Sequence, residues 1–498
     1  MSCYEDVRIE GLAYTGAGVA RLATGKTVFV EAAVPGDFAR IRIREERERF
    51  ARGAVEALLE ASPERVEPPC PYYARCGGCG LQHLSYREQL RWKRRFVVDA
   101  LERIGGLGDA EALVADTVAS PAEWGYRNKI ELEPLWRNNR LSLGLHAGAG
   151  FGDEGDGFGG GGADGGALGG GGFGSASADG GALGGGGAAG AEGSRGADSG
   201  GGTGIIPIEH CLLLPQGFAE LPGRLAGALG FALKASDAAA PLVRVGVRVS
   251  VRTGDVELAL WTRPGPCNRG FVAKVLGDAL KTSSLVRVLV AGDLRKRDVR
   301  KVEVLGGRGH WQERLGEFRY RVSAPSFFQV NTAAAQLLVG RALDELEGFD
   351  ADGGYVADLY SGAGTFTLPL ARKSQRVCAI EMAGSSIRDL RRNLAAYELE
   401  AQVLSGDVGR ALPELGTLGL GTLGYAIVDP PRGGLSTGAL RAIADAAPHT
   451  LVYVSCDPAT LARDVKAFAA RGYRPASVTP FDLFPQTWHV ETVTKLVR

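Results

Sequence analysis

The sequence contains 498 residues, of which 45% are hydrophobic, so it is long enough for two to four domains with buried cores. Its 57 basic and 57 acidic residues give zero net charge, which neither favours nor excludes a nucleic-acid partner. No run approaches the roughly 18 apolar residues of a membrane span. Residues 1–10 contain acids and lack the apolar core of a secretory signal. We therefore expect a cytoplasmic protein with no membrane contact.

The first sixty residues consist of short apolar runs separated by turn residues. Strands are expected at 7–9, 16–22, 27–30 and 38–43. Several short strands close together favour a small OB-like β-barrel, a fold that binds single-stranded nucleic acid. Prolines from Pro63 to Pro69 then indicate a boundary, so residues 1–62 form the first expected domain.

Three of the eight cysteines lie close together, at Cys70, Cys76 and Cys79. In a cytosolic chain such a cluster binds metal more often than it forms disulfides. Zinc and iron–sulphur clusters both accept these ligands, and the spacing alone does not separate them. His83 and His210 are conceivable additional ligands if the metal is zinc.

The central part, residues 66–322, is expected to be an α+β domain. A helix at 86–104, with a basic cluster around Trp92, is expected to pack on the domain that follows; the cluster fits a solvated surface and RNA contact equally well. A tract at 147–204 is dominated by Gly, Ala, Ser and Asp and is expected to be a disordered insertion. Strands are expected at 129–135, 141–145, 243–251, 256–261 and 286–290.

From about residue 323 to 498, apolar strands alternate with helical stretches. The strand candidates are 355–359, 376–380, 401–404, 425–428 and 451–454. This alternation predicts a doubly wound parallel sheet that binds ligands at the carboxyl ends of its strands.

A glycine-bearing loop closes the first of these strands, from Asp358 to Thr367. Acids end the next three strands, at Glu381, Asp407 and Asp429, where a ligand of such a sheet lies. A dinucleotide is the competing cofactor, but Thr367 stands where the last glycine of the dinucleotide motif is needed. The pattern favours S-adenosylmethionine.

Cys456 follows the last parallel strand directly and precedes Asp457-Pro458, so it is expected to project into the ligand cleft rather than to be an inert core residue. Near the chain end, Glu491 offers a carboxylate after another apolar stretch. A cysteine nucleophile and a carboxylate base can divide the steps of a covalent reaction.

Taken together, these segments resemble the RNA uracil-5-methyltransferase family, in particular the class that modifies 23S ribosomal RNA. The resemblance covers most of the chain outside the Gly-rich tract and rests on five segments in family order. These are Phe328-Gln329-Val330-Asn331, the loop at 358–366, Asp429-Pro430-Pro431-Arg432, Ser455-Cys456-Asp457-Pro458 and His489-Val490-Glu491-Thr492. Residues 14–20, Tyr-Thr-Gly-Ala-Gly-Val-Ala, look like part of a TRAM domain, an RNA-binding module common in this family.

The resemblance implies a Rossmann-like class I methyltransferase domain and a role for each candidate residue. The implied cofactor contacts are Gln329, Tyr360, Glu381, Asp407 and Asp429. Cys456 would be the nucleophile and Glu491 the base. The cysteine cluster would hold [4Fe-4S] with Cys211 as fourth ligand. The tRNA-modifying branch typically lacks the TRAM module and the cysteines, so 23S rRNA is the expected partner and tRNA the alternative; no obligate protein partner is implied.

Uracil C5 is too weak a nucleophile to take a methyl group unaided, and thiolate addition at C6 activates it. The target uridine is expected to be flipped out of its stack. Two rivals remain open on the sequence: an amino-group methyltransferase, which would not need Cys456, and a non-catalytic RNA-binding protein that no longer binds S-adenosylmethionine.

Overall fold

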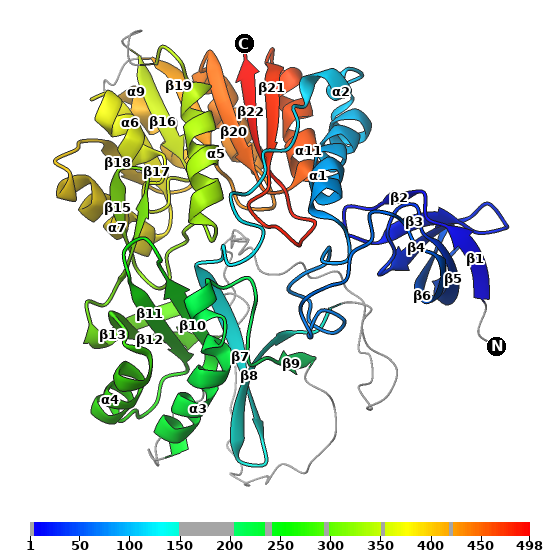
Figure 1. Cartoon of the computed structure of the whole chain (residues 1–498). Coiled ribbons are helices and arrows are strands. Elements are labelled where there is room, and N and C mark those ends of the chain that lie inside the picture. Colours follow the sequence, from blue (N-terminus) through cyan, green and yellow to red (C-terminus); the bar gives the residue numbers. More distant parts are fainter. Residues whose placement is uncertain (1–3, 149–203, 235–241, 293–297, 350–353, 418–421) are drawn as a thin grey trace, which may run out of the picture.

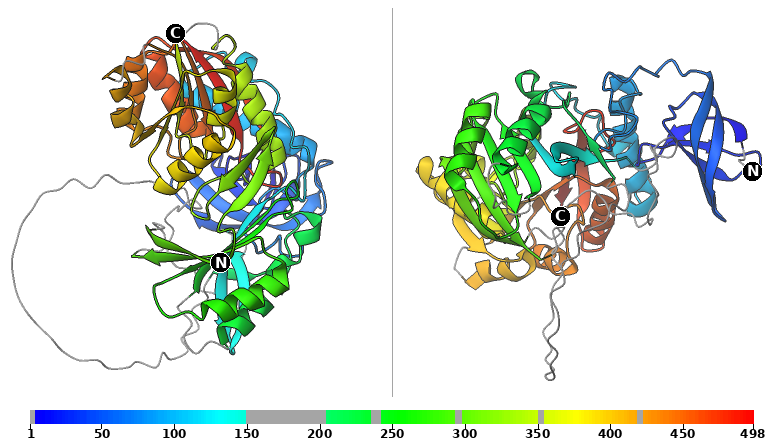
Figure 2. Two further views of the ribbon diagram at one scale, coloured as in Figure 1. Left: turned by 90° about the vertical axis from the view of Figure 1, so that its left-hand side faces the viewer. Right: turned by 90° about the horizontal axis from the view of Figure 1, so that it is seen from below.

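A computed structural model of the chain describes residues 4–148, 204–234, 242–292, 298–349, 354–417 and 422–498. Figure 1 shows three sheet-centred parts, with the N-terminal sheet beside helix α1 and the central sheet below the C-terminal one. The view from below shows that the N-terminal sheet lies to one side of the other two parts (Figure 2, right). No helix in the described ranges combines the length and the apolarity needed to cross a bilayer.

The N-terminal sheet is curled around a small apolar core. Its strands are β1 (Tyr4–Arg8), β2 (Gly11–Leu12), β3 (Gly18–Arg21), β4 (Thr27–Glu31), β5 (Phe38–Glu46) and β6 (Phe50–Glu60), in the spatial order β1-β5-β6-β4-β3-β2. The alternating residues Val28, Val30 and Ile41 point inward and are 0% exposed. Outward Arg and Glu side chains pair across strands, as Arg40 does with Asp6 at 2.8 Å.

Helix α1 (Tyr86–Ala100) joins the N-terminal half of the chain to the C-terminal sheet. Ser85 caps its first turn by accepting from the amide of Glu88 at 3.4 Å. A π-helical turn, η1 (Leu101–Gly105), extends it. Val97, Val98 and Leu101 are 0% exposed and share one core with the strands and helices of the C-terminal part. A short helix, α2 (Ala110–Leu113), follows.

The central sheet is mixed and is covered by two helices. Its strands are β7 (Lys129–Arg137), β8 (Arg140–His146), β9 (Ile205–Pro207), β10 (Leu242–Val249), β11 (Val256–Thr262), β12 (Ser284–Ala291) and β13 (Asp298–Gly307), in the order β13-β12-β11-β10-β7-β8-β9. The expected hairpin of β10 and β11 is antiparallel, whereas β12 pairs in parallel with β11 because α4 (Arg269–Leu280) intervenes. The 3-10 turn η2 (Gln216–Phe218) and α3 (Leu221–Lys234) precede β10.

The Gly-rich tract expected at 147–204 lies outside the described residues except at its two ends. These ends are adjacent, because the amide of Ala147 donates to the carbonyl of Gly204 at 2.7 Å. The strands that flank the tract also pair, with His146 opposite Ile205. The chain therefore leaves the central sheet and returns to it at one point.

A two-stranded hairpin, β14 (Trp311–Leu315) and β15 (Phe318–Val322), precedes α5 (Thr332–Asp344). Trp311 and Tyr320 are at most 1% exposed and share a core with Val356 of the C-terminal sheet. The hairpin thus packs with the residues that follow position 323.

The C-terminal sheet is a doubly wound sheet with an antiparallel end. Its strands are β16 (Tyr355–Leu359), β17 (Val377–Glu381), β18 (Gln402–Ser405), β19 (Leu423–Val428), β20 (Thr450–Ser455), β21 (Arg474–Phe481) and β22 (Glu491–Val497), in the order β18-β17-β16-β19-β20-β22-β21. The first five strands are parallel and correspond to the five that the sequence predicts. β22 pairs antiparallel with both β20 and β21.

Helices cover both faces of this sheet (Figure 1). On one face α1, η1, α8 (Val408–Ala411), α10 (Thr437–Ala446) and α11 (Pro458–Ala469) pack on alternate strand residues such as Ala357 and Leu359. On the other, α5, α6 (Thr367–Lys373) and α7 (Gly384–Ala396) pack on the residues between them, such as Val356. A four-residue helix, α9 (Glu414–Thr417), follows α8. Burial on both faces explains why these strands are continuously apolar in the sequence.

Candidate active site

The strand order of the C-terminal sheet reverses at β16, which lies between β17 and β19. Ligands of open α/β sheets bind at the carboxyl ends of the strands at such a point. The loop that leaves β16, residues 360–366, turns tightly there. Gly364 has φ of +98°, and a Cβ at this position would lie 2.7 Å from Leu368. Tyr360 has φ of +68°, a strained conformation for a residue with a side chain and one that occurs at functional sites.

Glu381 ends β17 and holds this loop. Its Oε2 accepts from the amide of Gly362 at 2.9 Å, and its Oε1 accepts from the amides of Met382 and Ala383 at 2.8 and 2.7 Å. Each carboxylate oxygen has more than one acceptor direction. The main chain therefore orients Glu381 and leaves an acceptor direction on Oε2 for a ribose hydroxyl.

Two further acids in this region have no cation among the described residues that lowers their pKa. Burial raises the pKa of Asp358 to about 7, against the lowering effect of its bond from Thr367. Burial and the charge of Asp358 raise the pKa of Asp429, at the end of β19, to about 7 as well. Oδ1 of Asp358 is buried without a hydrogen-bond partner among the described residues. A cationic ligand such as a sulfonium suits this donor set, because an opposite charge nearby stabilises the carboxylates.

The other expected cofactor contacts lie at different depths. Asp407 is exposed and caps α8 by accepting from the amide of Gly409 at 3.0 Å. Burial raises the pKa of Tyr360, and the negative charge of Asp407 raises it further, so these two residues lie near each other. Gln329 is 6% exposed, and its main-chain oxygen accepts from Asn128 Nδ2 at 2.9 Å. Its role toward a cofactor stays a prediction.

Cys456 and Glu491 come together through strand pairing. Ser455 at the end of β20 lies opposite Thr492 of β22, so the next positions along the two strands are Cys456 and Glu491. Thr492 also donates through Oγ1 to the carbonyl of Ser455 at 3.3 Å. Asp457, next to Cys456, caps α11 by accepting from the amide of Thr460 at 2.8 Å. Sheet register and a helix start together fix the two side chains that the sequence singles out.

The electrostatics of this pair follow from burial. Burial raises the pKa of Cys456 far above its usual range, the charges of Glu491 and Asp429 raise it further, and Arg432 opposes them. Burial also raises the pKa of Glu491 well above its ordinary value, with Asp429 adding to it and Arg432 lowering it. A bound cationic ligand would lower the pKa values of both Cys456 and Glu491. A lower pKa would give Cys456 more of its thiolate, which is the reactive form of cysteine.

Two residues at the site carry interactions that the sequence does not assign to them. Arg432 Nη2 lies 3.4 Å from Nε2 of His489. Burial, followed by the charges of Arg432, Lys93 and Arg127, lowers the pKa of His489 to about 3, so the imidazole is neutral. Both residues stand in segments quoted for the family resemblance, and their pairing becomes visible only in three dimensions.

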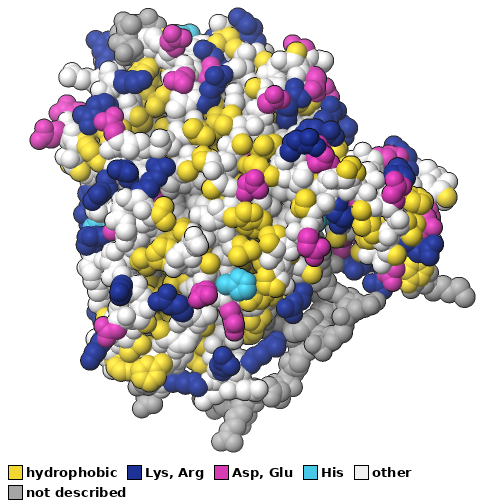
Figure 3. Space-filling model, viewed as in Figure 1, with side chains coloured by type: hydrophobic (Ala, Val, Ile, Leu, Met, Phe, Trp, Pro, Cys, Tyr) yellow, Lys and Arg dark blue, Asp and Glu magenta, His cyan; other side chains and the backbone are white. Residues whose placement is uncertain are grey.

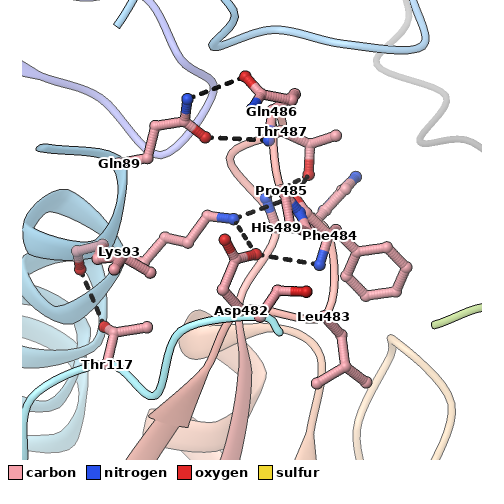
Figure 4. Close-up of polar contacts among 12 residues, drawn as sticks. Gln89, Lys93, Thr117, Asp482, Leu483, Phe484, Pro485, Gln486, Thr487 and His489 are labelled. Carbon is pink, nitrogen blue, oxygen red and sulfur yellow. Dashed lines mark hydrogen bonds and ion pairs between the residues drawn. The ribbon is translucent and has the colours of Figure 1, made fainter. Parts of the chain in front are cut away.

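The loop of residues 482–490 carries His489 and is anchored on α1 (Figure 4). Lys93 donates to Asp482 Oδ1 at 2.5 Å and to the carbonyl of Phe484 at 3.1 Å. The side chains of Lys93 and Asp482 are both 0% exposed. Gln89 and Gln486 exchange two bonds, from Gln89 Nε2 to Gln486 Oε1 at 3.0 Å and from the Gln486 amide to Gln89 Oε1 at 2.9 Å. A helix from the other half of the chain thus positions the segment before Glu491.

The four cysteines expected at a cluster come together from two distant segments. Burial raises the pKa of Cys79 to about 12, and the charges of Cys211, Cys76 and Cys70 raise it further, against a lowering bond from Gln82. Burial likewise raises the pKa of Cys76, to which Cys211 and Cys70 add. A bound cation would relieve this mutual destabilisation of the thiolates. Within the described ranges, however, no group of three or more His, Cys, Asp or Glu side chains has an arrangement that could hold a metal ion.

The histidines considered as zinc ligands have other contacts. Both ring nitrogens of His83 are engaged, Nδ1 with the hydroxyl of Tyr73 and Nε2 with the carbonyl of Ala33 at 3.4 Å. Burial lowers the pKa of His83 to about 4. His210 packs on Tyr72 with ring centroids 5.0 Å apart.

The face seen in Figure 3 carries Lys and Arg side chains interspersed with Asp and Glu, in keeping with the zero net charge.

The sheet, its switch-point loop and the acids at its strand ends define an enzyme class that binds an adenosine-type cofactor. The sequence profile of the tRNA (Uracil-5-)-methyltransferase family matches residues 273–498, and the TRAM domain profile matches residues 4–55. An uncharacterized RNA methyltransferase of Gloeobacter violaceus is 32% identical over 99% of this chain and 96% of its own length. One of Halalkalibacterium halodurans is 30% identical over the same shares of the two chains.

A solved structure with the same overall fold is the Pyrococcus abyssi tRNA (uracil-54, C5)-methyltransferase in complex with S-adenosyl-L-homocysteine. It matches with a TM-score of 0.67 and 23% identity, covering 99% of this chain and all of the other. The chain belongs to the uracil-5-methyltransferase family of RNA methyltransferases. It is an S-adenosylmethionine-dependent enzyme that acts on RNA and carries an N-terminal TRAM domain. The family resemblance expected from the sequence is confirmed; its iron–sulphur subclass stays a prediction.

Proposed function

We propose that this enzyme methylates C5 of a uridine in cytoplasmic 23S rRNA through a covalent bond between Cys456 and C6 of the base. The supporting observation is the strand register that pairs Cys456 with Glu491, close to Asp429 at the end of β19. An amino-group methyltransferase has no use for this cysteine and carboxylate pair. We also propose that the chain is divided into three domains, at residues 1–62, 66–322 and 323–498.

The cofactor supplies a methyl group on a sulfonium centre. Gln329, Tyr360, Glu381, Asp407 and Asp429 would hold it. The Cys456 thiolate adds to C6, so the S–C6 bond forms and the C5=C6 double bond becomes an enolate. C5 then takes the methyl group: the C5–CH3 bond forms as the bond from the methyl carbon to the sulfonium sulfur breaks, and S-adenosyl-L-homocysteine would leave as a neutral thioether. Glu491 accepts the C5 proton, the C5=C6 bond re-forms, and the thiolate leaves C6. Each turnover thus returns the thiolate and releases one proton through the carboxyl.

RNA containing 5-fluorouridine tests this scheme, because fluorine at C5 cannot leave as a proton and the adduct is trapped. Wild-type protein with S-adenosylmethionine should form a denaturation-resistant RNA adduct that peptide mapping assigns to Cys456. The Cys456→Ala protein should form none. Glu491→Gln should accumulate a methylated adduct on ordinary uridine RNA. Cys267→Ala is the matched control, since Cys267 lies in the central part of the chain. An adduct at another residue, or full turnover by Cys456→Ala, would refute the scheme.

A second candidate target is tRNA. It is favoured by the full-length fold match to the Pyrococcus abyssi tRNA (uracil-54, C5)-methyltransferase. Mapping 5-methyluridine in ribosomal and transfer RNA, from cells with and without this protein, separates the two. Loss confined to 23S rRNA supports the first target, and loss confined to tRNA the second.

We further propose that Cys70, Cys76, Cys79 and Cys211 hold a [4Fe-4S] cluster, with zinc as the alternative metal. The approach of these four half-buried cysteines to one another, from two distant segments, supports it. The role we assign is structural, because methyl transfer needs no redox step. Anaerobically purified protein should contain iron and sulfide, and Cys211→Ser should lose both while Cys267→Ser keeps them. Stoichiometric zinc without iron would replace the cluster with a zinc site.

A further inference from the structure

Tyr14 belongs to the N-terminal sheet but lies at the catalytic cysteine. It stands on the turn between β2 and β3. Two main-chain bonds of 2.8 Å each close this turn, one from the amide of Gly16 to the carbonyl of Ala13 and one from the amide of Ala13 to the carbonyl of Ala17. Its hydroxyl donates to the main-chain carbonyl of Cys456 at 3.5 Å, across 442 positions of sequence. In the sequence, Tyr14 is notable only as part of the TRAM-like segment.

The surroundings of the Tyr14 hydroxyl are those of the active site. Burial raises the pKa of Tyr14 above its ordinary value, and the charges of Asp457, Cys456 and Glu491 add to this while Arg432 opposes it. The phenol is therefore protonated at any working pH. It can donate a hydrogen bond, but it cannot serve as the base that deprotonates the thiol.

Aromatic packing holds this tyrosine in place. Its ring meets Phe96 of α1 edge to face, with centroids 5.5 Å apart. The turn is anchored by Trp488 of the 482–490 loop, whose ring occupies the space beside two glycines. A Cβ on Gly16 would lie 3.0 Å from this ring, and one on Gly80 would lie 2.1 Å from it. The N-terminal sheet is thus fitted onto the same loop that leads to Glu491.

We propose that Tyr14 is a positioning residue for the nucleophile, supplied to the catalytic pocket by the TRAM domain. Its hydroxyl fixes the peptide of Cys456 at the point where β20 ends and α11 has not yet begun, and the contact of its ring with Phe96 holds the hydroxyl there. The TRAM domain is accordingly a part of the active site as well as an RNA-binding module. This inference rests on the proposed role of Cys456.

At 3.5 Å the bond is longer than most O–H···O bonds, so its contribution is at most that of one ordinary hydrogen bond, equivalent to an about 2- to 10-fold change in rate. Tyr14→Phe removes the hydroxyl and keeps the ring on Phe96. We expect the full-length Tyr14→Phe enzyme to form the 5-fluorouridine adduct about 2- to 10-fold more slowly. The amplitude of adduct formation, the affinity for S-adenosylmethionine and the KM for RNA should stay within twofold of wild type.

Tyr14→Ala also removes the ring and should lower the adduct rate further at the same amplitude. Tyr4→Phe is the matched control, because Tyr4 lies on the same sheet and is 46% exposed. An unchanged rate in Tyr14→Phe, or a loss only in KM or in amplitude, would overturn the positioning role while leaving the Cys456 scheme intact. Failure of the wild type to form a Cys456 adduct would overturn both.

Discussion

Replacing Lys93 by methionine removes one charge of a fully buried ion pair and keeps most of the side-chain volume. Both partners are 0% exposed, and Nζ lies 2.5 Å from Asp482 Oδ1. Asp482 then stays buried without its cation. Breaking a buried pair from one side costs about 3–5 kcal/mol of unfolding free energy. For a domain of about 150–250 residues, such as the C-terminal one, that loss corresponds to a fall in Tm of about 6–20 °C.

Differential scanning calorimetry on Lys93→Met, Asp482→Asn and the double variant measures this. The double variant should be more stable than the sum of the single effects by at least about 1 kcal/mol, because neither charge is then left alone. Lys301→Met is the control, since Lys301 is 65% exposed and 3.4 Å from Glu303. Its cost should be below about 1 kcal/mol. Equal losses in Lys93→Met and Lys301→Met, or strictly additive single effects, would refute the reasoning.

Three further outcomes are expected. Replacing residues 149–203 by a two-residue turn should leave Tm and methyl transfer unchanged, because Ala147 and Gly204 are already bonded; a lower Tm would contradict this. The pKa of Asp358 rises to about 7 on folding, so its stabilisation is complete below its unfolded pKa and is lost as pH rises through 7. The Tm of cofactor-free enzyme should therefore fall from about pH 5 to about 8, and less so in Asp358→Asn, whereas parallel curves would count against it. Glu381→Gln should weaken S-adenosylmethionine binding by about tenfold or more in calorimetric titration, because the amide puts a donor against main-chain N–H groups; unchanged affinity would refute this.

The parallel part of the C-terminal sheet could be predicted because its strands are buried on both faces. Continuous apolar runs such as 355–359 and 425–428 carry that information locally. The edge strands are harder. β6 has an exposed second half, and β13 is exposed along most of its length, so neither shows a clear apolar pattern. The hairpin of β14 and β15 alternates clearly but is short.

The features of the candidate site fall into the same two groups, those that a local sequence pattern predicts and those that it does not. The placement of Glu381 and Cys456 at strand ends could be predicted, because Glu381 is the last residue of a recognisable strand and Cys456 follows another. The Arg432 and His489 pair, the Lys93 and Asp482 pair, and the approach of Tyr14 depend on contacts between segments far apart in the chain, which no local pattern records.

The amides of Gly80 and Leu81 both bond to the carbonyl of Gln486 at 2.9 Å, so this segment docks on one that is translated much later. Ribosomes add about 5–20 residues per second, which leaves the early segment without its docking partner for roughly 20–80 s. Over that interval the apolar side of α1 has no completed sheet to cover it. During synthesis, we therefore expect α1 to expose this apolar side to chaperones and proteases until the strands of the C-terminal sheet have been made.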